Sequence, residues 1–246
     1  MMKFSVRDRE VIKVFACVLF MFVILWCSIN MRIIFGSVKV SPDNITSIMR
    51  DKYQNCIQIL GIIVPIVYSL AFYKIFALGE KHIIIRYGKR RYEKIESKNI
   101  FIFSFIFAVE YILTDFIFMN LFSDISVLLK SAYYLFVLLK FIMLILYLNL
   151  IGATLYILRN ILGFSNLYII VGSLIYVLWT SLYYILLSDT CPSFYMNFAT
   201  EWFDYHTFDS FSYIINLAKL FFASLILKYL GEIVFLRRDI LENEEN

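Results

Sequence analysis

Four charged side chains lie inside long apolar stretches of this 246-residue chain, and they are the first candidates for chemistry. Burying a charge in hydrocarbon costs at least about 2.5 to 3.5 kcal/mol, so such a residue normally has a partner or faces water. Charges of this kind can line an ion or transport pathway, or they can form ion pairs that fix helix register. The four residues are Glu110, Asp115, Lys140 and Lys219.

Depth relates three of these charges. Asp115 lies seven residues before the outer end of its predicted span, and Lys140 and Lys219 lie seven and eight residues after the outer ends of theirs. Each residue is therefore roughly 10 to 12 Å below the outer edge of the membrane. We therefore expect Asp115 to pair with Lys140 or Lys219. We favour a static ion pair, with a charge lining a transport pathway as the alternative. Glu110 lies near mid-membrane without a cation at its depth, so it is expected to be protonated, hydrogen-bonded or exposed to a water-filled cavity.

Several familiar catalytic and metal sites can be discounted from the sequence. The chain has no GxxxxGK[ST] motif and cannot hydrolyse nucleotide by itself. His82 and His206 are predicted on opposite membrane sides, which excludes a two-histidine metal site within one chain. We expect no catalytic residue, no metal and no cofactor in this chain, and so no enzyme. Cys56 and Cys191 are both predicted near one face, which leaves a disulfide open.

The elements that position these charges are membrane-spanning helices. Hydrophobic residues make up 61% of the chain, against about 45 to 50% in soluble proteins, and a bilayer core needs roughly 20 apolar helical residues. The sequence predicts an all-α, polytopic membrane protein that forms a single transmembrane domain over residues 1–246. Its six predicted spans are Val14–Phe35, Cys56–Leu78, Ile100–Phe122, Tyr133–Leu158, Leu167–Leu187 and Phe211–Phe235.

The distribution of Lys and Arg predicts the orientation, because cations near span ends are kept in the cytoplasm. Most of them lie in segments 1–13, 79–99 and 236–246, so both termini are predicted to be cytoplasmic. The opposite side includes segment 188–210, which has no Lys or Arg and carries Asp189, Glu201, Asp204 and Asp209. The net charge of +4 therefore reflects topology and contact with anionic lipid, and it does not indicate nucleic-acid binding.

Segment 79–99 is basic and amphipathic. Drawn as a helix, it places Ile84, Tyr87, Tyr92 and Ile95 on one side and Arg86, Lys89, Arg90 and Glu93 on the other. Gly88 weakens a continuous helix by about 1 kcal/mol, so two short helical pieces are as plausible as one. The pattern suits an interfacial helix and a docking element for a cytoplasmic partner equally.

Segment 188–210 is strongly aromatic and too short to span a bilayer. It could lie in the outer interface as an aromatic belt, or it could dip back into the protein and act as a gate. We rank the belt slightly ahead of the gate. The aromatic residues in question include Phe194, Tyr195, Phe198, Trp202 and Phe203.

In this order of elements the chain resembles the ABC-2 type permease subunit of ABC transporters, also called a type V exporter. The resemblance rests on an N-terminal element at 1–13, a basic segment IIIRYGKRRYEKI at 83–95 between the second and third spans, and an outer segment at 188–210. It implies a domain map of spans 1–2 over 14–78, a coupling region over 79–99, spans 3–5 over 100–187, an outer gate over 188–210, span 6 over 211–235 and a tail over 236–246.

Chain size and the basic segment are similar to those of small Gram-positive permeases that export antimicrobial peptides. The resemblance implies a bacterial plasma-membrane protein that moves an amphipathic peptide of bacteriocin type, or a lipid-like cargo, outward. Its partners would be a separate ATPase that uses ATP and Mg²⁺, a second copy or a related permease, and membrane lipid. The coupling residues would be Ile83, Ile84, Ile85, Arg86, Tyr87, Lys89, Arg90, Arg91 and Tyr92. The alternative is a non-transporting immunity or accessory protein that binds a peptide or another membrane protein.

Overall fold

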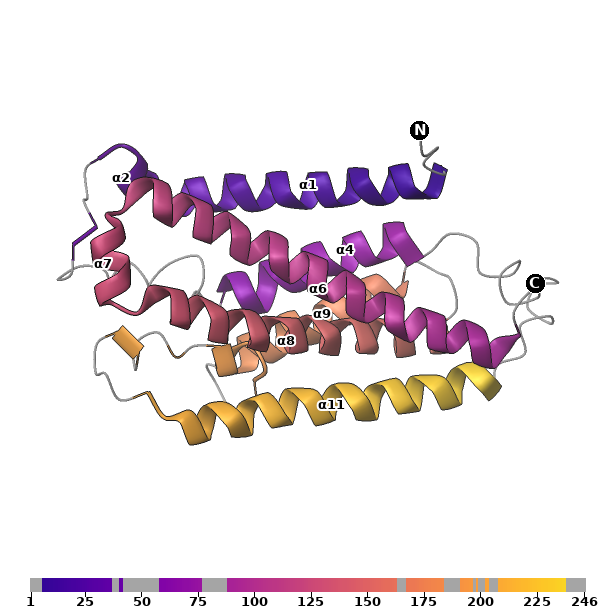
Figure 1. Cartoon of the computed structure of the whole chain (residues 1–246). Helices are drawn as coiled ribbons and strands as arrows, with labels where there is room; N and C mark the ends of the chain where they lie inside the picture. The colour runs from indigo at the N-terminus through magenta and orange to yellow at the C-terminus, as the bar shows by residue number, and fades with distance from the viewer. Residues whose placement is uncertain are drawn as a thin grey trace.

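The computed structural model describes the chain as a bundle of long helices, with no strand in the described residues (Figure 1). Within that part, five helices are long and apolar enough to cross a membrane, and the chain is a multi-pass membrane protein. A further apolar helix, Leu167–Leu182, is shorter than these. The structure describes residues 6–36, 40–41, 58–76, 88–162, 167–183, 191–196, 198, 202–203 and 208–237.

The long helices follow the predicted spans in order, with bounds that differ at several ends. The elements are α1 (Val6–Ile29), α2 (Met31–Ile34), the π-turn η1 (Ile59–Ile63), α4 (Val64–Phe76), α6 (Lys89–Phe122), α7 (Ile125–Lys130), α8 (Tyr133–Leu162), α9 (Leu167–Tyr183), the 3₁₀ turn η3 (Phe194–Met196) and α11 (Ser210–Arg237). Helix α9 is the counterpart of the predicted fifth span, so a sixth crossing stays a prediction.

The bundle has two distinct ends. Helices α6 and α8 are joined through α7 at one end, and α1 begins and α11 finishes at the other end (Figure 1). Following the predicted orientation, we call these the outer end and the inner end. Because α1 begins and α11 finishes at the same end, the arrangement agrees with an even number of crossings. The cytoplasmic placement of that end stays a prediction.

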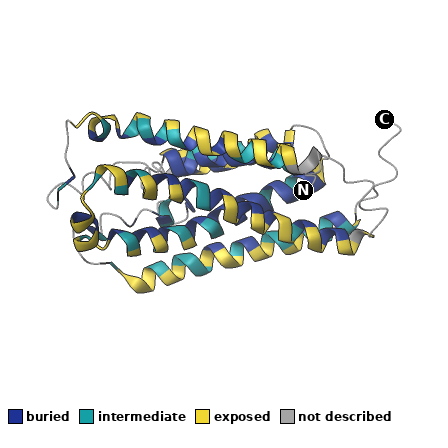
Figure 2. Cartoon of the chain, turned by 45° about the horizontal axis from the view of Figure 1, so that its top comes forward, coloured by how far each residue is buried: buried dark blue, intermediate teal, exposed yellow. Residues whose placement is uncertain are grey.

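Helix α8 forms the centre of the bundle and packs against α4, α6, α9 and α11. In the apolar 18-residue stretch of α8, 61% of the residues are buried, whereas only 17% are buried in the corresponding stretches of α1 and α11. Figure 2 shows the same contrast, with exposed residues along the outer faces of α1 and α11. The polar residues that α8 carries are therefore buried, whereas those on α11 can reach lipid or a second chain.

Helix α6 runs without interruption from the basic segment into the membrane. It begins at Lys89, directly after Gly88, whose φ of +78° is accessible to glycine and strained for other residues. The helix therefore begins well before the predicted span start at Ile100, and the point at which it enters the membrane stays a prediction. The first predicted span is extended in the same way, since α1 begins at Val6 rather than at Val14.

The second predicted span begins with a π-turn that a proline explains. Pro65 has no N–H, so the carbonyl of Leu60, its partner in the π register, is left open. The Tyr147 hydroxyl on α8 donates to this Leu60 carbonyl at 3.0 Å, and the Thr180 hydroxyl on α9 donates to the next carbonyl, Gly61, at 3.2 Å. Two neighbouring helices therefore supply the hydrogen bonds that a lipid environment cannot.

Candidate functional site

A buried carboxylate joins three elements near the outer end. Asp115 on α6 is 4% exposed, and its Oδ1 accepts a hydrogen bond from Trp26 Nε1 of α1 at 2.8 Å. Its Oδ2 accepts one from the Tyr133 hydroxyl at the start of α8 at 2.7 Å. Each carboxylate oxygen has a donor, which is the condition for keeping a buried carboxylate charged. Sequence reasoning did not identify Trp26 or Tyr133 as these donors.

Lys140 on α8 is fully buried beside this carboxylate. Its ammonium donates to the backbone carbonyl of Met196, and it lies 5.5 Å from the ring centroid of Phe198. The charge of Asp115 acts attractively on that of Lys140. Lys140, one of the two cations predicted as partners of Asp115, therefore lies within reach of its charge, and a direct ion pair between them stays a prediction. Lys140 also holds the outer segment, because Met196 and Phe198 both belong to that segment.

The other two intramembrane charges have different surroundings. Lys219 lies on the exposed face of α11, where its ammonium donates to Asn216 Oδ1 at 3.3 Å and lies 5.1 Å from the Tyr195 ring. Glu110 is half-buried, and its Oε2 has no hydrogen-bond partner among the described residues. We expected Glu110 to be protonated, hydrogen-bonded or exposed to water. The described residues give no support for a hydrogen bond to this oxygen.

A buried ion pair lies at the inner end, and the sequence analysis did not single it out. Arg159 on α8 and Glu96 on α6 are 2.5 Å apart, and their side chains are 0% and 4% exposed. The Arg159 guanidinium also donates to the carbonyl of Phe76 at the end of α4, at 3.5 Å, and lies 5.3 Å from the Tyr156 ring. One guanidinium thus ties α4, α6 and α8 together.

The first turns of α6 show why this pair was missed. Glu93, predicted on the polar side, is 7% exposed, and Ile95, predicted on the apolar side, is 39% exposed. These two assignments are wrong, because the helix packs on α8 and α11, whose Arg159 and Lys228 attract its acidic residues. The spacing of Glu93, Glu96 and Ile100 at one helix face would have indicated this, had the segment been treated as part of the span.

The predicted coupling residues are described only in part. Residues 83–87 lie outside the described residues, and so does the side chain of Lys89. Arg90 and Arg91 are exposed in the first turn of α6. Tyr92 is buried and packs on Phe235 of α11, with ring centroids 5.7 Å apart.

The outer aromatic residues pack onto α8 rather than forming only a belt. The rings of Phe198 and Phe203 are buried, with centroids 5.2 and 4.9 Å from that of Phe136 on α8. Phe194, Tyr195 and Trp202 are half-buried in the same region. The part of the outer segment that the structure describes therefore dips back into the protein.

The outer segment also bonds to the π-turn through small polar groups. The Thr180 hydroxyl lies 3.2 Å from the Gly61 carbonyl and 3.3 Å from Ser193 Oγ. Ser193 Oγ is also 3.1 Å from the thiol of Cys191, which is free and buried. Cys56, the predicted disulfide partner, lies outside the described residues. Pro65 was the sequence signal that could have pointed to this region, because a proline in a span frees backbone carbonyls.

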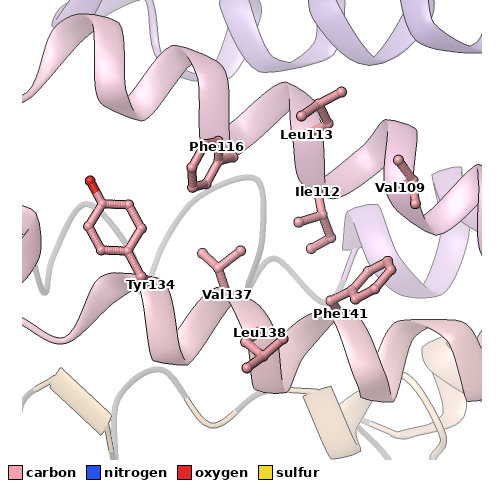
Figure 3. A pocket seen from close by; sticks show the side chains of 8 residues that line it. All are labelled: Val109, Ile112, Leu113, Phe116, Tyr134, Val137, Leu138 and Phe141. Carbon is pink, nitrogen blue, oxygen red and sulfur yellow. The ribbon is translucent and has the colours of Figure 1, made fainter.

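An apolar groove of about 290 Å³ opens sideways between α6 and α8. Figure 3 shows side chains of both helices around it, with Val109, Leu113 and Phe116 above Val137 and Phe141. The one hydroxyl on its rim, that of Tyr134, donates to Asn120 Oδ1 at 2.8 Å. A groove of this size and character suits an acyl chain.

In the described residues no group of three or more His, Cys, Asp or Glu side chains could hold a metal ion. The geometry instead favours a mechanical role, because each end of α8 carries a buried cation that holds a different segment of the chain. Comparison with known proteins finds no matching family model, no matching curated protein and no matching solved structure.

Proposed function

We propose that this chain is the membrane-spanning permease subunit of an ATP-driven ABC exporter in a bacterial plasma membrane. A separate ATPase would bind the basic inner segment, and an amphipathic peptide or a lipid-like molecule would be the cargo. The observation that carries the proposal is the pair of buried cations on α8. Arg159 holds the inner end of α6, and Lys140 holds the outer segment.

The two cations support a route for mechanical coupling. Helix α6 has 34 residues, so it is about 50 Å long and reaches from the basic turn to the outer end. Movement of its first turn would act on α8 through the Glu96–Arg159 pair. Movement of α8 would act on the outer segment through Lys140 and the Met196 carbonyl. Packed helices transmit such displacements because their interfaces do not deform continuously.

The interior of the chain favours a cargo path between two subunits rather than through one. Large side chains fill the centre of the bundle, and Tyr68, Phe107, Phe136 and Tyr147 are each 0% exposed. Helices α1 and α11, in contrast, expose apolar faces. A second copy or a related permease would cover part of these faces.

Charge reversal tests the ATPase contact. Changing Arg86, Lys89 and Arg90 to Glu should abolish co-purification of the ATPase while membrane insertion is unchanged. A matched control reverses Arg9, Lys74 and Arg237, which are exposed cations near the same end of the bundle and lie outside segment 79–99. The control should retain the ATPase. Unchanged co-purification of the first variant would contradict the proposed docking site.

The alternative function is a non-transporting immunity or accessory protein. The filled interior agrees with it, because such a protein needs no channel through the single chain. This function needs the outer segment to bind a peptide or another membrane protein, but it needs no ATPase. The two functions separate on one observation, since only the exporter requires an ATPase at comparable abundance in the purified complex. An enzyme would instead lose a chemical activity on Glu110→Gln without losing assembly.

A further inference from the structure

An aromatic cavity lies between the outer segment and the outer end of α11. Its volume is about 90 Å³, whereas one water needs at least about 10 to 15 Å³, so there is room for a small organic group. We call it the outer cage, and its wall residues that matter here are Phe194, Tyr195, Phe198, Phe208, Tyr213 and Asp209.

Three rings of the outer cage hold one another in place. The centroids of Phe198, Phe208 and Tyr213 are separated by 5.6 to 5.7 Å in all three pairs. The Tyr213 hydroxyl donates to the Leu139 carbonyl of α8 at 2.9 Å, which fixes that ring. Trp202 packs edge-on against Phe208 at 5.0 Å. The cage is therefore built from packed side chains that are fixed before any ligand arrives.

A carboxylate closes one edge of the outer cage. Asp209 is exposed, and it accepts hydrogen bonds from Ser212 Oγ at 2.5 Å and from the Phe211 N–H at 2.9 Å. The Ser212 hydroxyl, followed by the Phe211 N–H, lowers the pKa of this carboxyl below its ordinary value. Asp209 therefore carries a negative charge at neutral pH.

The charge and the aromatic residues of segment 188–210 both indicate a cationic ligand. Segment 188–210 contains acidic residues and no Lys or Arg. The aromatic cluster already accepts ammonium groups of this chain, with Lys140 at 5.5 Å from the Phe198 centroid and Lys219 at 5.1 Å from the Tyr195 centroid. Aromatic faces beside a carboxylate are a recognition site for organic cations.

We propose that the outer cage binds an alkylammonium group, with the aromatic faces and the Asp209 carboxylate as its partners. The inference rests on the proposed function in one respect: the bound cation would belong to an amphipathic cargo leaving the outer face. Lysine side chains and quaternary ammonium headgroups share this chemistry. Binding itself needs no ATPase, so it can be tested separately from transport.

Substitutions at Lys219 and at Asp209 should change the affinity for an alkylammonium in opposite directions. Its ammonium is held by Asn216, which lines the same cavity, and so it repels a second cation there. Replacing Lys219 by Gln should raise the affinity for an alkylammonium, whereas replacing Asp209 by Asn should lower it. Asn is also a good N-cap residue, so Asp209→Asn keeps the start of α11 intact.

The experiment measures binding to the full chain in phosphatidylglycerol nanodiscs by ligand-observed NMR. The probes are choline and 3,3-dimethylbutan-1-ol, which has the same shape without the charge. We expect choline to bind about tenfold more tightly than the alcohol, which is the order of a desolvated cation–aromatic contact. Asp209→Asn should weaken choline binding about fivefold and leave binding of the alcohol unchanged. Phe208→Leu, which stays apolar, should also weaken choline binding.

A primary amine distinguishes the two ligand sources. Tighter binding of n-butylammonium than of choline would identify a lysine side chain, and the reverse preference would identify a quaternary headgroup. Equal affinity for choline and the neutral alcohol, or choline binding that is unchanged in Asp209→Asn, would overturn the proposal. A cage that binds cations in a chain without an associated ATPase would leave this inference standing and refute the exporter function.

Discussion

The two buried cations of α8 hold their segments by different chemistry. Arg159 at the inner end faces a carboxylate, Glu96, in a close ion pair. Lys140 at the outer end donates to a backbone carbonyl and lies among aromatic rings, with the Asp115 charge acting from nearby. An ion pair resists separation strongly once it is buried, whereas an ammonium on a carbonyl can exchange that partner for water. From this difference we predict that the inner end is the fixed joint and that the outer end opens more readily.

The inner pair should show the largest effect. Arg159→Met or Glu96→Gln leaves a buried charge without its partner and should lower the free energy of unfolding by about 3 to 5 kcal/mol. Joint replacement of both residues should cost less than the sum of the single changes, as measured by denaturant titration in detergent. Lys13→Met is the control, because Lys13 and Glu10 form an exposed ion pair at 2.6 Å worth about 0 to 1 kcal/mol. Additive effects at Arg159 and Glu96 would contradict the fixed joint.

The outer pair should show smaller coupling. Asp115→Asn and Lys140→Met should each cost about 2 to 3 kcal/mol, because each removes a charged hydrogen-bonding group from a buried site. The double change should cost less than the sum, by an amount smaller than at the inner pair. The same titrations measure it, with Lys219→Met as the exposed control. A double change as costly as the sum would show that Asp115 and Lys140 are not paired.

The joint between the π-turn and α9 should respond to added volume. A Cβ at Gly61 would lie 2.3 Å from Thr180 Oγ1, so Gly61→Ala should destabilise the chain by about 1 to 3 kcal/mol. Adding Thr180→Ala should recover part of this loss, because it removes the clashing atoms. Thr180→Ala alone is the control, since it shortens the side chain opposite Gly61 without adding volume there. An equal cost with and without Thr180 would place the clash elsewhere.

Opening of the outer end can be followed at one thiol. Cys191 is 1% exposed in the segment that Lys140 holds. In a background without the other cysteines, Lys140→Met should raise the rate of maleimide labelling about tenfold, which corresponds to about 1.4 kcal/mol of local opening. Arg159→Met should raise it less. An equal rise in both variants would remove the distinction between the two ends.

Sequence reasoning captured the parts of this fold that depend on local patterns. Apolar length predicted the order of the long helices, and the start of α8 at Tyr133 was predicted correctly. Counting residues from the span ends also placed Asp115 and Lys140 at one depth. These features follow from helix geometry and from the cost of charge in hydrocarbon.

The contacts that hold the two ends depend on residues far apart in the chain. Glu96 was assigned to the basic segment 79–99, outside the spans, so its position opposite Arg159 was not recognised. The acceptor of Lys140 is the backbone carbonyl of Met196, and a carbonyl carries no residue-type signal. Tyr147 likewise bonds to the Leu60 carbonyl that Pro65 leaves open, and Thr180 bonds to the neighbouring Gly61 carbonyl. A proline within a span predicts that such donors exist, but it does not identify the helices that supply them.

The most direct test of the exporter function is to tag this chain in its native cell, extract it in mild detergent and identify stoichiometric partners by mass spectrometry. We predict one P-loop ATPase at an abundance comparable to that of the chain, and its loss when Arg86, Lys89 and Arg90 are changed to Glu. Reproducible absence of any ATPase from intact, folded chain would contradict the exporter function and favour the immunity or accessory alternative.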